Sequence, residues 1–530
     1  MANRGKNHAM DHVVVVVFEN RSLDNLLGRL YGPGDGKIFD GVAGKNLTNP
    51  IPEWAEHGAE RKTVPYTVAT DMDSPNPDTG EEYSHTNTQL YNILDEPNRF
   101  KIRDEVAEPY NAPAPGQVPT MDGFVTDYIS TLTAELGRQP AYQEYSQVMT
   151  GFTPEQVPVL SGLARGFGVF DHWFSEVPSQ TFTNRSFWTS ATASGYVVNS
   201  PARNWLHNDA ETIFERLEAH GRTWRVYVGE PDRFSITGLI HYPRLKGRFE
   251  SHFVPFAQFE ADAADGRLPD FSFIEPCLVL GHGDYHPAVS RALGHGVVIP
   301  GVDPPSSILG GEAFLARIYQ AYQAMQSPTG SNVWNTALLI GWDEPGGTYD
   351  HVPPGPVPPP DPTEPAGQFG FAFDRSGYRV PAILVSPWVA EGEVFNEEHR
   401  HTSLIATLRE AWELGDPLTA RDAAARTFTH AFTLDTPRDP DTWPTMHAHP
   451  VPEYIEDALL LGKSLTALGK TAFEAIRGFA QQQGIRIDGL PDDANAPIPP
   501  ERAPGIIRDY LAIQFPLLAK ARVGAGARRA

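Results

Sequence analysis

The segment VVVVVFENRS, at residues 13–22, decides the fold. Its apolar part, Val13–Phe18, has no polar alternation, which is typical of a strand buried on both faces of a parallel sheet. The run is too short for a signal-peptide core or a membrane span. Polar residues follow directly, and ligands gather at the carboxyl ends of the strands in such sheets. Glu19 and Asn20 are therefore candidates for a functional site.

Other apolar runs end as abruptly, namely Thr223–Val228, Phe271–Ile274, Ala337–Gly341 and Ala382–Val385. Between the runs, apolar residues recur at helical spacing in 23–30 and 314–322. Alternating strands and helices predict an α/β protein with a three-layer α/β/α fold and a mostly parallel central sheet. The 49 prolines and 47 glycines indicate long loop insertions.

We expect one catalytic domain over residues 1–440, a helical C-terminal region at 441–520 packed on it, and a disordered tail at 521–530. Helical patterns begin near Leu404 and are clearest in 454–468 and 472–483. Substrate specificity is expected to lie in the long loops of the catalytic domain, at 75–120, 230–260 and 352–370.

The chain has 42 Lys and Arg residues against 66 Asp and Glu residues, a formal charge of −24. A field of this sign repels nucleic acid and anionic membranes, so we expect no nucleic-acid partner. We also expect no integral membrane association, since the run Val13–Phe18 is too short to span a membrane. The single cysteine, Cys277, excludes an intramolecular disulfide, and we expect a buried, inert thiol. The polar N-terminus predicts a cytoplasmic protein, with export of a longer precursor left open, and the oligomeric state stays open.

Oxygen-bearing side chains follow two of the predicted core strands. Glu19-Asn20 follows the first strand and Asp343-Glu344 a later one, and such donors suit Mg²⁺, Ca²⁺ or Mn²⁺. Alternatives are a helix start capped by Asn20 or Ser22 and a solvated turn at Asp343-Glu344. Burying two adjacent acidic side chains without a cation costs free energy. The presence of two such clusters therefore favours a metal site that both clusters share.

Hydroxyl groups precede a helical stretch in VPSQTFTNRSFWT, residues 177–189. Such groups are usually helix caps, but a metal-bound hydroxyl loses its proton more easily and becomes a nucleophile. A helix start would also place a phosphoryl group among free N–H donors. Among the 18 histidines, each is more often a surface or core residue than a catalytic one. Histidine is still suited to protonating a leaving alkoxide.

In this order, several segments resemble the phosphoesterase family of bacterial acid phosphatases and non-specific phospholipases C, within the alkaline phosphatase superfamily. The segments are FENRSLDN (18–25), MDGF (121–124), TFTNR (181–185), FIEP (273–276), DEPGGTYDH (343–351), YRVP (378–381) and HTS (401–403). These seven segments in this order are a far more specific signature than any one segment alone. The resemblance spans about residues 10–440.

The resemblance implies an alkaline-phosphatase-like fold and a phosphoric-ester hydrolase with Thr181 as nucleophile. It implies one divalent ion (Ca²⁺, Mg²⁺, Mn²⁺ or Zn²⁺) with the ligands Glu19, Asn20, Thr181, Asp343 and Glu344. It also implies that Asn184 holds a phosphoryl oxygen and that the site is lined by His85, His286 and His351. The chain departs from the family pattern at Leu23, Asn25, Thr183 and Pro345, and Pro345 removes a possible proton donor.

We predict hydrolysis of a small-molecule phosphomonoester through a phosphothreonine intermediate, with His286 or His351 protonating the leaving oxygen. The first alternative is a phospholipase C that releases a phosphorylated head group from a lipid phosphate ester. A catalytically inactive, ligand-binding family member is the non-enzyme alternative, and the retained nucleophile and ligands argue against it. Sulfatase-like chemistry needs a modifiable Cys or Ser where this chain has Thr181.

Overall fold

The computed structural model describes residues 5–102, 105–230, 235–278, 283–287 and 307–451. Its central sheet runs in the order β13 (Glu393–Phe395), β6 (Gly168–Phe170), β12 (Ala382–Val385), β11 (Thr336–Trp342), β1 (His12–Phe18), β10 (Phe271–Glu275), β8 (Trp224–Val228) and β9 (Phe253–Pro255). All five strands predicted from apolar runs form. Only β12 runs antiparallel to its neighbours in this sheet, so the mostly parallel arrangement is confirmed.

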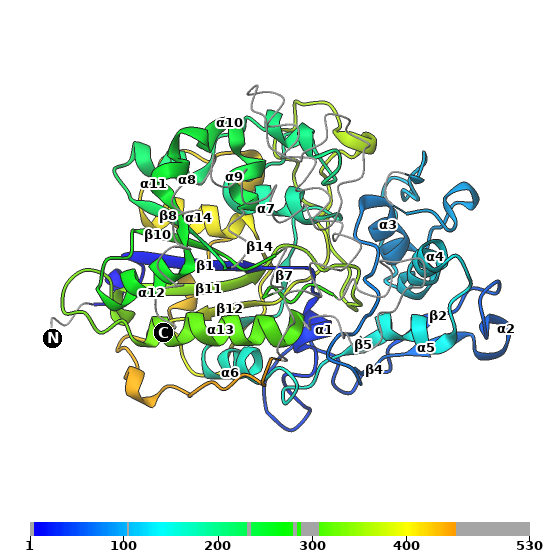
Figure 1. The fold of residues 1–530 in the computed structure, drawn as a ribbon, viewed down its shortest axis with the longest axis horizontal. Helices are drawn as coiled ribbons and strands as arrows, with labels where there is room; N and C mark the ends of the chain where they lie inside the picture. Colours follow the sequence, from blue (N-terminus) through cyan, green and yellow to red (C-terminus); the bar gives the residue numbers. More distant parts are fainter. Residues whose placement is uncertain (1–4, 103–104, 231–234, 279–282, 288–306, 452–530) are drawn as a thin grey trace, which may run out of the picture.

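Helices cover both faces of the sheet, which confirms the three-layer α/β/α architecture (Figure 1). One layer contains α6 (Pro158–Gly166), α12 (Phe256–Ala264) and α13 (Ser307–Gln323). The other contains α7 (Thr181–Ser190), α8 (Ile213–Ala219), α9 (Ile236–Ile240) and α14 (Thr402–Ala411). The apolar runs of β1 and β11 are buried along their length, apart from the first residue of β1. None of the helices in the described part of the chain is long and apolar enough to cross a membrane.

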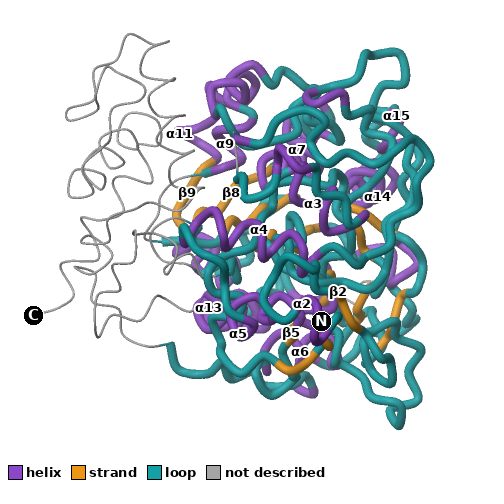
Figure 2. The backbone as a smooth tube through the Cα atoms, turned by 90° about the vertical axis from the view of Figure 1, so that its right-hand side faces the viewer, coloured by secondary structure: helices purple, strands orange, loops and turns teal. Residues whose placement is uncertain are grey.

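A lobe built from residues 47–151 lies beyond the carboxyl ends of the parallel strands, and it faces the viewer in Figure 2. Its elements are β2 (Thr48–Pro50), α2 (Gly58–Arg61), β3 (Thr63–Pro65), β4 (Thr67–Val68), α3 (Tyr83–Tyr91), α4 (Phe124–Leu136), α5 (Tyr142–Tyr145) and β5 (Thr150–Gly151). The lobe has a second hydrophobic core, to which Tyr349 and Tyr378 of the main body contribute.

Two of the predicted loops contain helices. All of α3 is buried, yet its sequence YSHTNTQLY is mostly polar, so no apolar periodicity marks it within 75–120. The segment 230–260 contains α9, α10 (Tyr242–Leu245), α11 (Phe249–His252) and β9. The third predicted loop, 352–370, is irregular apart from a short 3₁₀ turn, Gln368–Gly370.

The prediction of mainly helical structure from Leu404 onward is wrong for residues 412–451. Beyond α14 this stretch holds only α15 (Ala420–Ala423) and two 3₁₀ turns, Thr429–Ala431 and Pro440–Thr442. The predicted helices at 454–468 and 472–483 and the tail at 521–530 lie outside the described residues. Cys277 is buried, as expected.

Candidate active site

The carboxyl ends of β1 and β11 bring the two predicted ligand pairs together. The strands are parallel neighbours, and Phe18 lies opposite Trp342. Glu19 and Asp343 therefore leave the sheet side by side, and both are fully buried. The backbone N–H of Asn20 donates to Asp343 Oδ1 over 3.2 Å, which joins the two strand ends.

The turns that follow β1 and β11 pack closely against each other because the backbone is left-handed at Asn20 and Gly346. Asn20 has φ of 52°, a conformation that Asn tolerates better than most residues. Gly346 has φ of 60°, and a Cβ atom there would lie 2.3 Å from the Asn20 carbonyl oxygen. A side chain at residue 346 would therefore push Asn20 away from the strand end.

Thr181 is the first residue of α7, the helix whose positive N-terminal end points at the strand ends. Its hydroxyl donates to Glu19 Oε2 over 3.3 Å, and the residue is 2% exposed. The structure thus brings the predicted nucleophile to one of the predicted metal ligands. Ser22 rather than Asn20 caps the helix after β1, α1 (Leu23–Leu27), because its hydroxyl accepts from Asn25 N.

Asn184 shapes the turn that precedes Thr181. Its Oδ1 accepts hydrogen bonds from the backbone N–H groups of Glu176 and Val177, over 2.9 and 3.0 Å. Its Nδ2 donates to the carbonyl oxygens of Val177, Ser179 and Gln180. These bonds use both amide hydrogens within the turn. In this arrangement Asn184 presents Thr181 and has no spare N–H for the phosphoryl oxygen assigned to it by resemblance.

Arg185 joins the two buried carboxylates, a role that the sequence did not reveal. Its Nε donates to Glu19 Oε1 over 2.9 Å and to Asp343 Oδ2 over 3.1 Å. Burial alone would lower the pKa of Arg185, but the carboxylates of Glu19 and Asp343 outweigh it and raise the pKa. The sequence feature that could have pointed to Arg185 is its spacing from Thr181, because residues 181 and 185 lie on the same face of a helix. Arg185 takes one oxygen of Glu19 and leaves the other to Thr181.

The oxygen atoms at the strand ends fit a divalent cation. Burial, followed by neighbouring carboxylates, raises the pKa of Asp343 and of Glu344 well above the ordinary range. Asn20 Oδ1 and Glu344 Oε1 are buried and have no hydrogen-bond partner in the described part of the chain. Unpaired buried oxygens beside crowded carboxylates are the donor set that a hard cation binds.

Among the described residues, two groups of three Asp, Glu or His side chains have ligand atoms that all lie within 4.8 Å of one another: Asp24, Asp350 and His351, and Asp78, Glu81 and His286. The strand-end acids Glu19, Asp343 and Glu344 do not form such a group. In the first group Arg379 lies 3.0 Å from both aspartates and supplies a countercharge, as Arg185 does for Glu19 and Asp343 at the strand ends. The second group adjoins Asn20 through Glu81 and His286.

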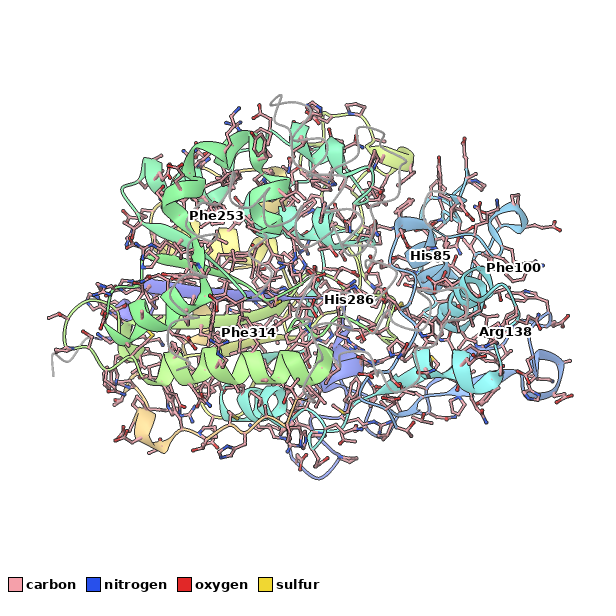
Figure 3. All side chains as sticks on the ribbon, viewed as in Figure 1. His85, Phe100, Arg138, Phe253, His286 and Phe314 are labelled. Atoms are coloured by element: carbon pink, nitrogen blue, oxygen red, sulfur yellow. The ribbon has the colours of Figure 1, made fainter. Side chains whose placement is uncertain are left out.

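The three predicted histidines lie in different surroundings. His286 Nε2 is 3.1 Å from Asn20 Nδ2, so His286 borders the site. His85 lies farther out, on α3 of the lobe, and its Nδ1 is 2.8 Å from Asp127 Oδ1 (Figure 3). His351 lies in the Asp24 group, with Nδ1 2.6 Å from Asp24 Oδ2. Among the described residues, His286 is the one of these three histidines that contacts a predicted ligand, Asn20.

His351 makes the stability of the protein depend on pH. Burial would lower the pKa of His351, but hydrogen bonds with Asp24 and Asp40 outweigh it and raise the pKa to about 9. Because the folded value lies above the unfolded value, about 6.5, the protonated histidine stabilises the fold below about pH 6.5. This stabilisation disappears as pH rises through about 9.

Replacing His351 by Gln should therefore remove up to about 3 kcal/mol of the unfolding free energy at pH 6, and little at pH 9.5. Urea unfolding at several pH values measures the difference, and kcat should change far less than it does on loss of Thr181. Equal destabilisation at all pH values would contradict the role of the charged form.

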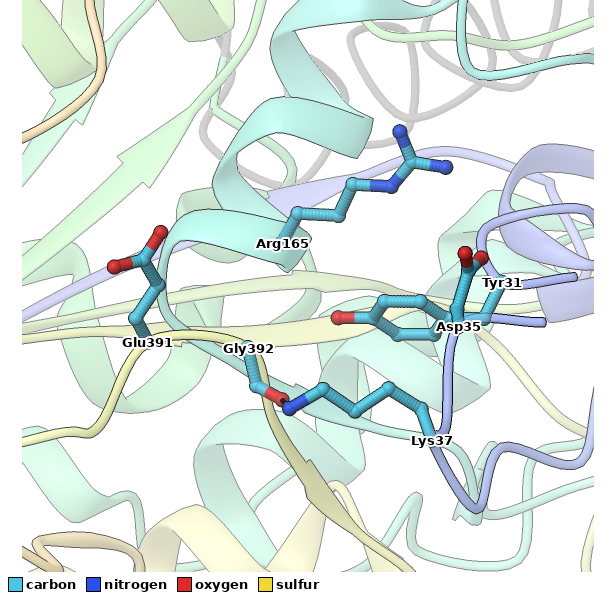
Figure 4. Close-up of a pocket in the computed structure, with 6 residues that line it drawn as sticks. All are labelled: Tyr31, Asp35, Lys37, Arg165, Glu391 and Gly392. Carbon is cyan, nitrogen blue, oxygen red and sulfur yellow. Dashed lines mark hydrogen bonds between the residues drawn. The ribbon is translucent and has the colours of Figure 1, made fainter.

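A surface pocket of about 400 Å³ lies apart from this site, lined by Tyr31, Asp35, Lys37, Arg165, Glu391 and Gly392 (Figure 4). Two of its charged side chains are basic and two are acidic. Lys37 donates to the Gly392 carbonyl, and Arg165 to the Leu30 carbonyl. The pocket therefore has no excess positive charge for a phosphate group.

A family model described as the phosphoesterase family matches residues 10–415. Non-specific phospholipase C6 of Arabidopsis thaliana is 33% identical over 471 residues, which cover 84% of this chain and 77% of that protein. Phospholipase C B of Mycobacterium tuberculosis is 25% identical over 501 residues, covering 87% and 85%. The lipoteichoic acid synthase LtaP from Listeria monocytogenes aligns over 53% of this chain and 69% of its own, with 11% identity and a TM-score of 0.31.

Proposed function

This chain belongs to the phosphoesterase family and hydrolyses phosphoric esters, and from this premise we propose that it is a divalent-metal-dependent phosphomonoesterase with Thr181 as nucleophile. The observation that carries the proposal is the 3.3 Å contact between Thr181 Oγ1 and Glu19 Oε2, at the joint end of two core strands. A nucleophilic hydroxyl, a carboxylate beside it and a helix start meet at one point.

The residues have separate roles in the proposed reaction. Thr181 Oγ1 attacks phosphorus in line with the leaving oxygen, so the alcohol departs and a phosphothreonine forms. Water then attacks that phosphorus, which releases phosphate and restores the Thr181 hydroxyl. Glu19, Asn20, Thr181, Asp343 and Glu344 would hold one divalent cation, which neutralises phosphoryl charge and favours the alkoxide. Arg185 holds Glu19 and Asp343 in place through its hydrogen bonds to both side chains.

His286 is the histidine best placed to protonate the leaving oxygen, because it borders Asn20 while His85 and His351 lie in other contacts. Replacing His286 by Gln should lower kcat for an alkyl phosphate by about 10²-fold or more, since its alkoxide needs a proton. For p-nitrophenyl phosphate, whose leaving group is stable as an anion, the loss should be below about 10-fold. Equal losses for both esters would rule out His286 as the acid.

Phospholipase C activity is the second candidate function, favoured by the names of the relatives. The two functions differ in product. A monoesterase releases inorganic phosphate from a small ester, whereas a phospholipase C releases phosphocholine from a choline phospholipid in mixed micelles. We expect the larger kcat/KM for the small monoester. A larger value for phosphocholine release would replace the monoesterase proposal by the lipid one.

A further inference from the structure

Glu81 connects the lobe to two parts of the active site. The residue is 7% exposed and directly precedes Glu82, the N-cap of α3. Its Oε2 accepts a hydrogen bond from Asn20 Nδ2, and its Oε1 accepts one from Gln180 Nε2 over 3.1 Å. One carboxylate therefore spans a predicted metal ligand and the residue before the nucleophile.

The bond to Asn20 fixes which way its amide faces. An Asn side chain has one acceptor oxygen and one donor NH₂ group, and a half-turn of the amide exchanges them. Glu81 Oε2 accepts from the NH₂ group, and the opposite orientation would set Asn20 Oδ1 against this oxygen atom. Asn20 Oδ1 is consequently directed away from Glu81, and it is one of the buried oxygens without a partner among the described residues.

The bond to Gln180 holds the start of the nucleophile helix. Gln180 is the N-cap residue of α7, but its side chain makes no capping bond to that helix. Its Oε1 instead accepts from the backbone N–H of Asn199 over 2.9 Å, while its Nε2 donates to Glu81. Asn199 Oδ1 in turn accepts from Phe182 N. The first residues of α7 are thus anchored from two sides.

We infer that Glu81 is a positioning residue, which turns Asn20 Oδ1 towards the cation and holds the Thr181 end of α7 against the strand ends. The lobe then contributes to the active site through a side chain that acts on Asn20 and Gln180. This inference rests on the proposed function, because it assigns a purpose to the orientation of a proposed metal ligand.

The experiment measures Mn²⁺ binding by calorimetry on the metal-stripped full chain, for the wild type, Glu81→Gln, Asn20→Ala and the double variant. A Gln at residue 81 keeps the shape but cannot accept from both amides. Glu81→Gln should weaken Mn²⁺ binding by about 10- to 100-fold in the wild-type background, as expected for a lost outer contact to a ligand. In the Asn20→Ala background it should weaken binding by less than about 3-fold, since no ligand remains to be oriented.

The control is Glu260→Gln, which removes an exposed carboxylate paired with Arg317 and should leave Mn²⁺ binding unchanged. Melting temperatures of all variants show whether each is folded. Equal effects of Glu81→Gln in the two backgrounds would overturn the inference, and so would a wild type that binds no Mn²⁺. A wild type that binds Mn²⁺ with the expected coupling but hydrolyses no ester contradicts the monoesterase proposal and leaves the role of Glu81 supported.

Discussion

Replacing Thr181 by Ala is expected to lower kcat by on the order of 10⁴-fold or more, because the hydroxyl proposed to form the phosphoenzyme is removed. Mn²⁺ binding should weaken only modestly, since the four other proposed ligands remain. Rapid acid quenching followed by peptide mass spectrometry measures the intermediate directly. Wild-type enzyme mixed with a phosphate ester should carry one phosphate on the peptide that contains Thr181, and the variant should carry none.

Thr183→Ala is the matched control for this experiment. Thr183 lies in the same helix and is also buried, but its hydroxyl donates to the Tyr196 carbonyl, over 3.0 Å. The control should keep kcat within about 10-fold of the wild type and should still form the phosphopeptide. Turnover near the wild-type rate in the Thr181→Ala variant would contradict the nucleophile assignment.

Replacing Asp343 by Asn should reduce Mn²⁺ affinity by at least about 100-fold and remove measurable turnover. The substitution keeps the shape of the side chain but takes away a charge, and its NH₂ group opposes the Nε–H of Arg185. Metal content after dialysis, measured by plasma emission spectroscopy, gives the stoichiometry. His351→Gln is the control, because it alters one of the two further metal-capable groups, the one that contains Asp24 and Asp350.

The two variants distinguish the strand-end site from the Asp24 group. Retained Mn²⁺ in His351→Gln with loss in Asp343→Asn supports the strand-end site. The reverse pattern would place the ion in the Asp24 group and would remove Asp343 from the set of ligands.

The core of the fold was predictable because a strand that is buried on both faces of a sheet has an unbroken run of apolar residues. The valines of β1 and the apolar residues of β11 have no polar alternation, so the two strands and the mostly parallel sheet were predicted, whereas the pairing of β1 with β11 came from the structure. The antiparallel direction of β12 was not visible, because a short apolar run is the same in either direction. α3 was missed since its buried residues are mostly polar and are satisfied by long-range hydrogen bonds rather than by apolar packing.

The site was predictable only in part, and for a comparable reason. Glu19 and Asp343 follow core strands, so a parallel sheet brings them together. The roles of Glu81 and Arg185 depend on contacts between residues 61 to 166 positions apart, which no local pattern encodes. The resemblance assigned Asn184 to a phosphoryl oxygen. Its hydrogen bonds to the preceding turn depend on the local backbone conformation, which the sequence did not show.

The most direct measurement is anomalous X-ray scattering from a crystal of the protein soaked in Mn²⁺. We expect one strong peak about 2.0–2.6 Å from side-chain oxygens of Glu19, Asn20, Thr181, Asp343 and Glu344. A strong peak at Asp24, Asp350 and His351, with none at the strand ends, would contradict this expectation.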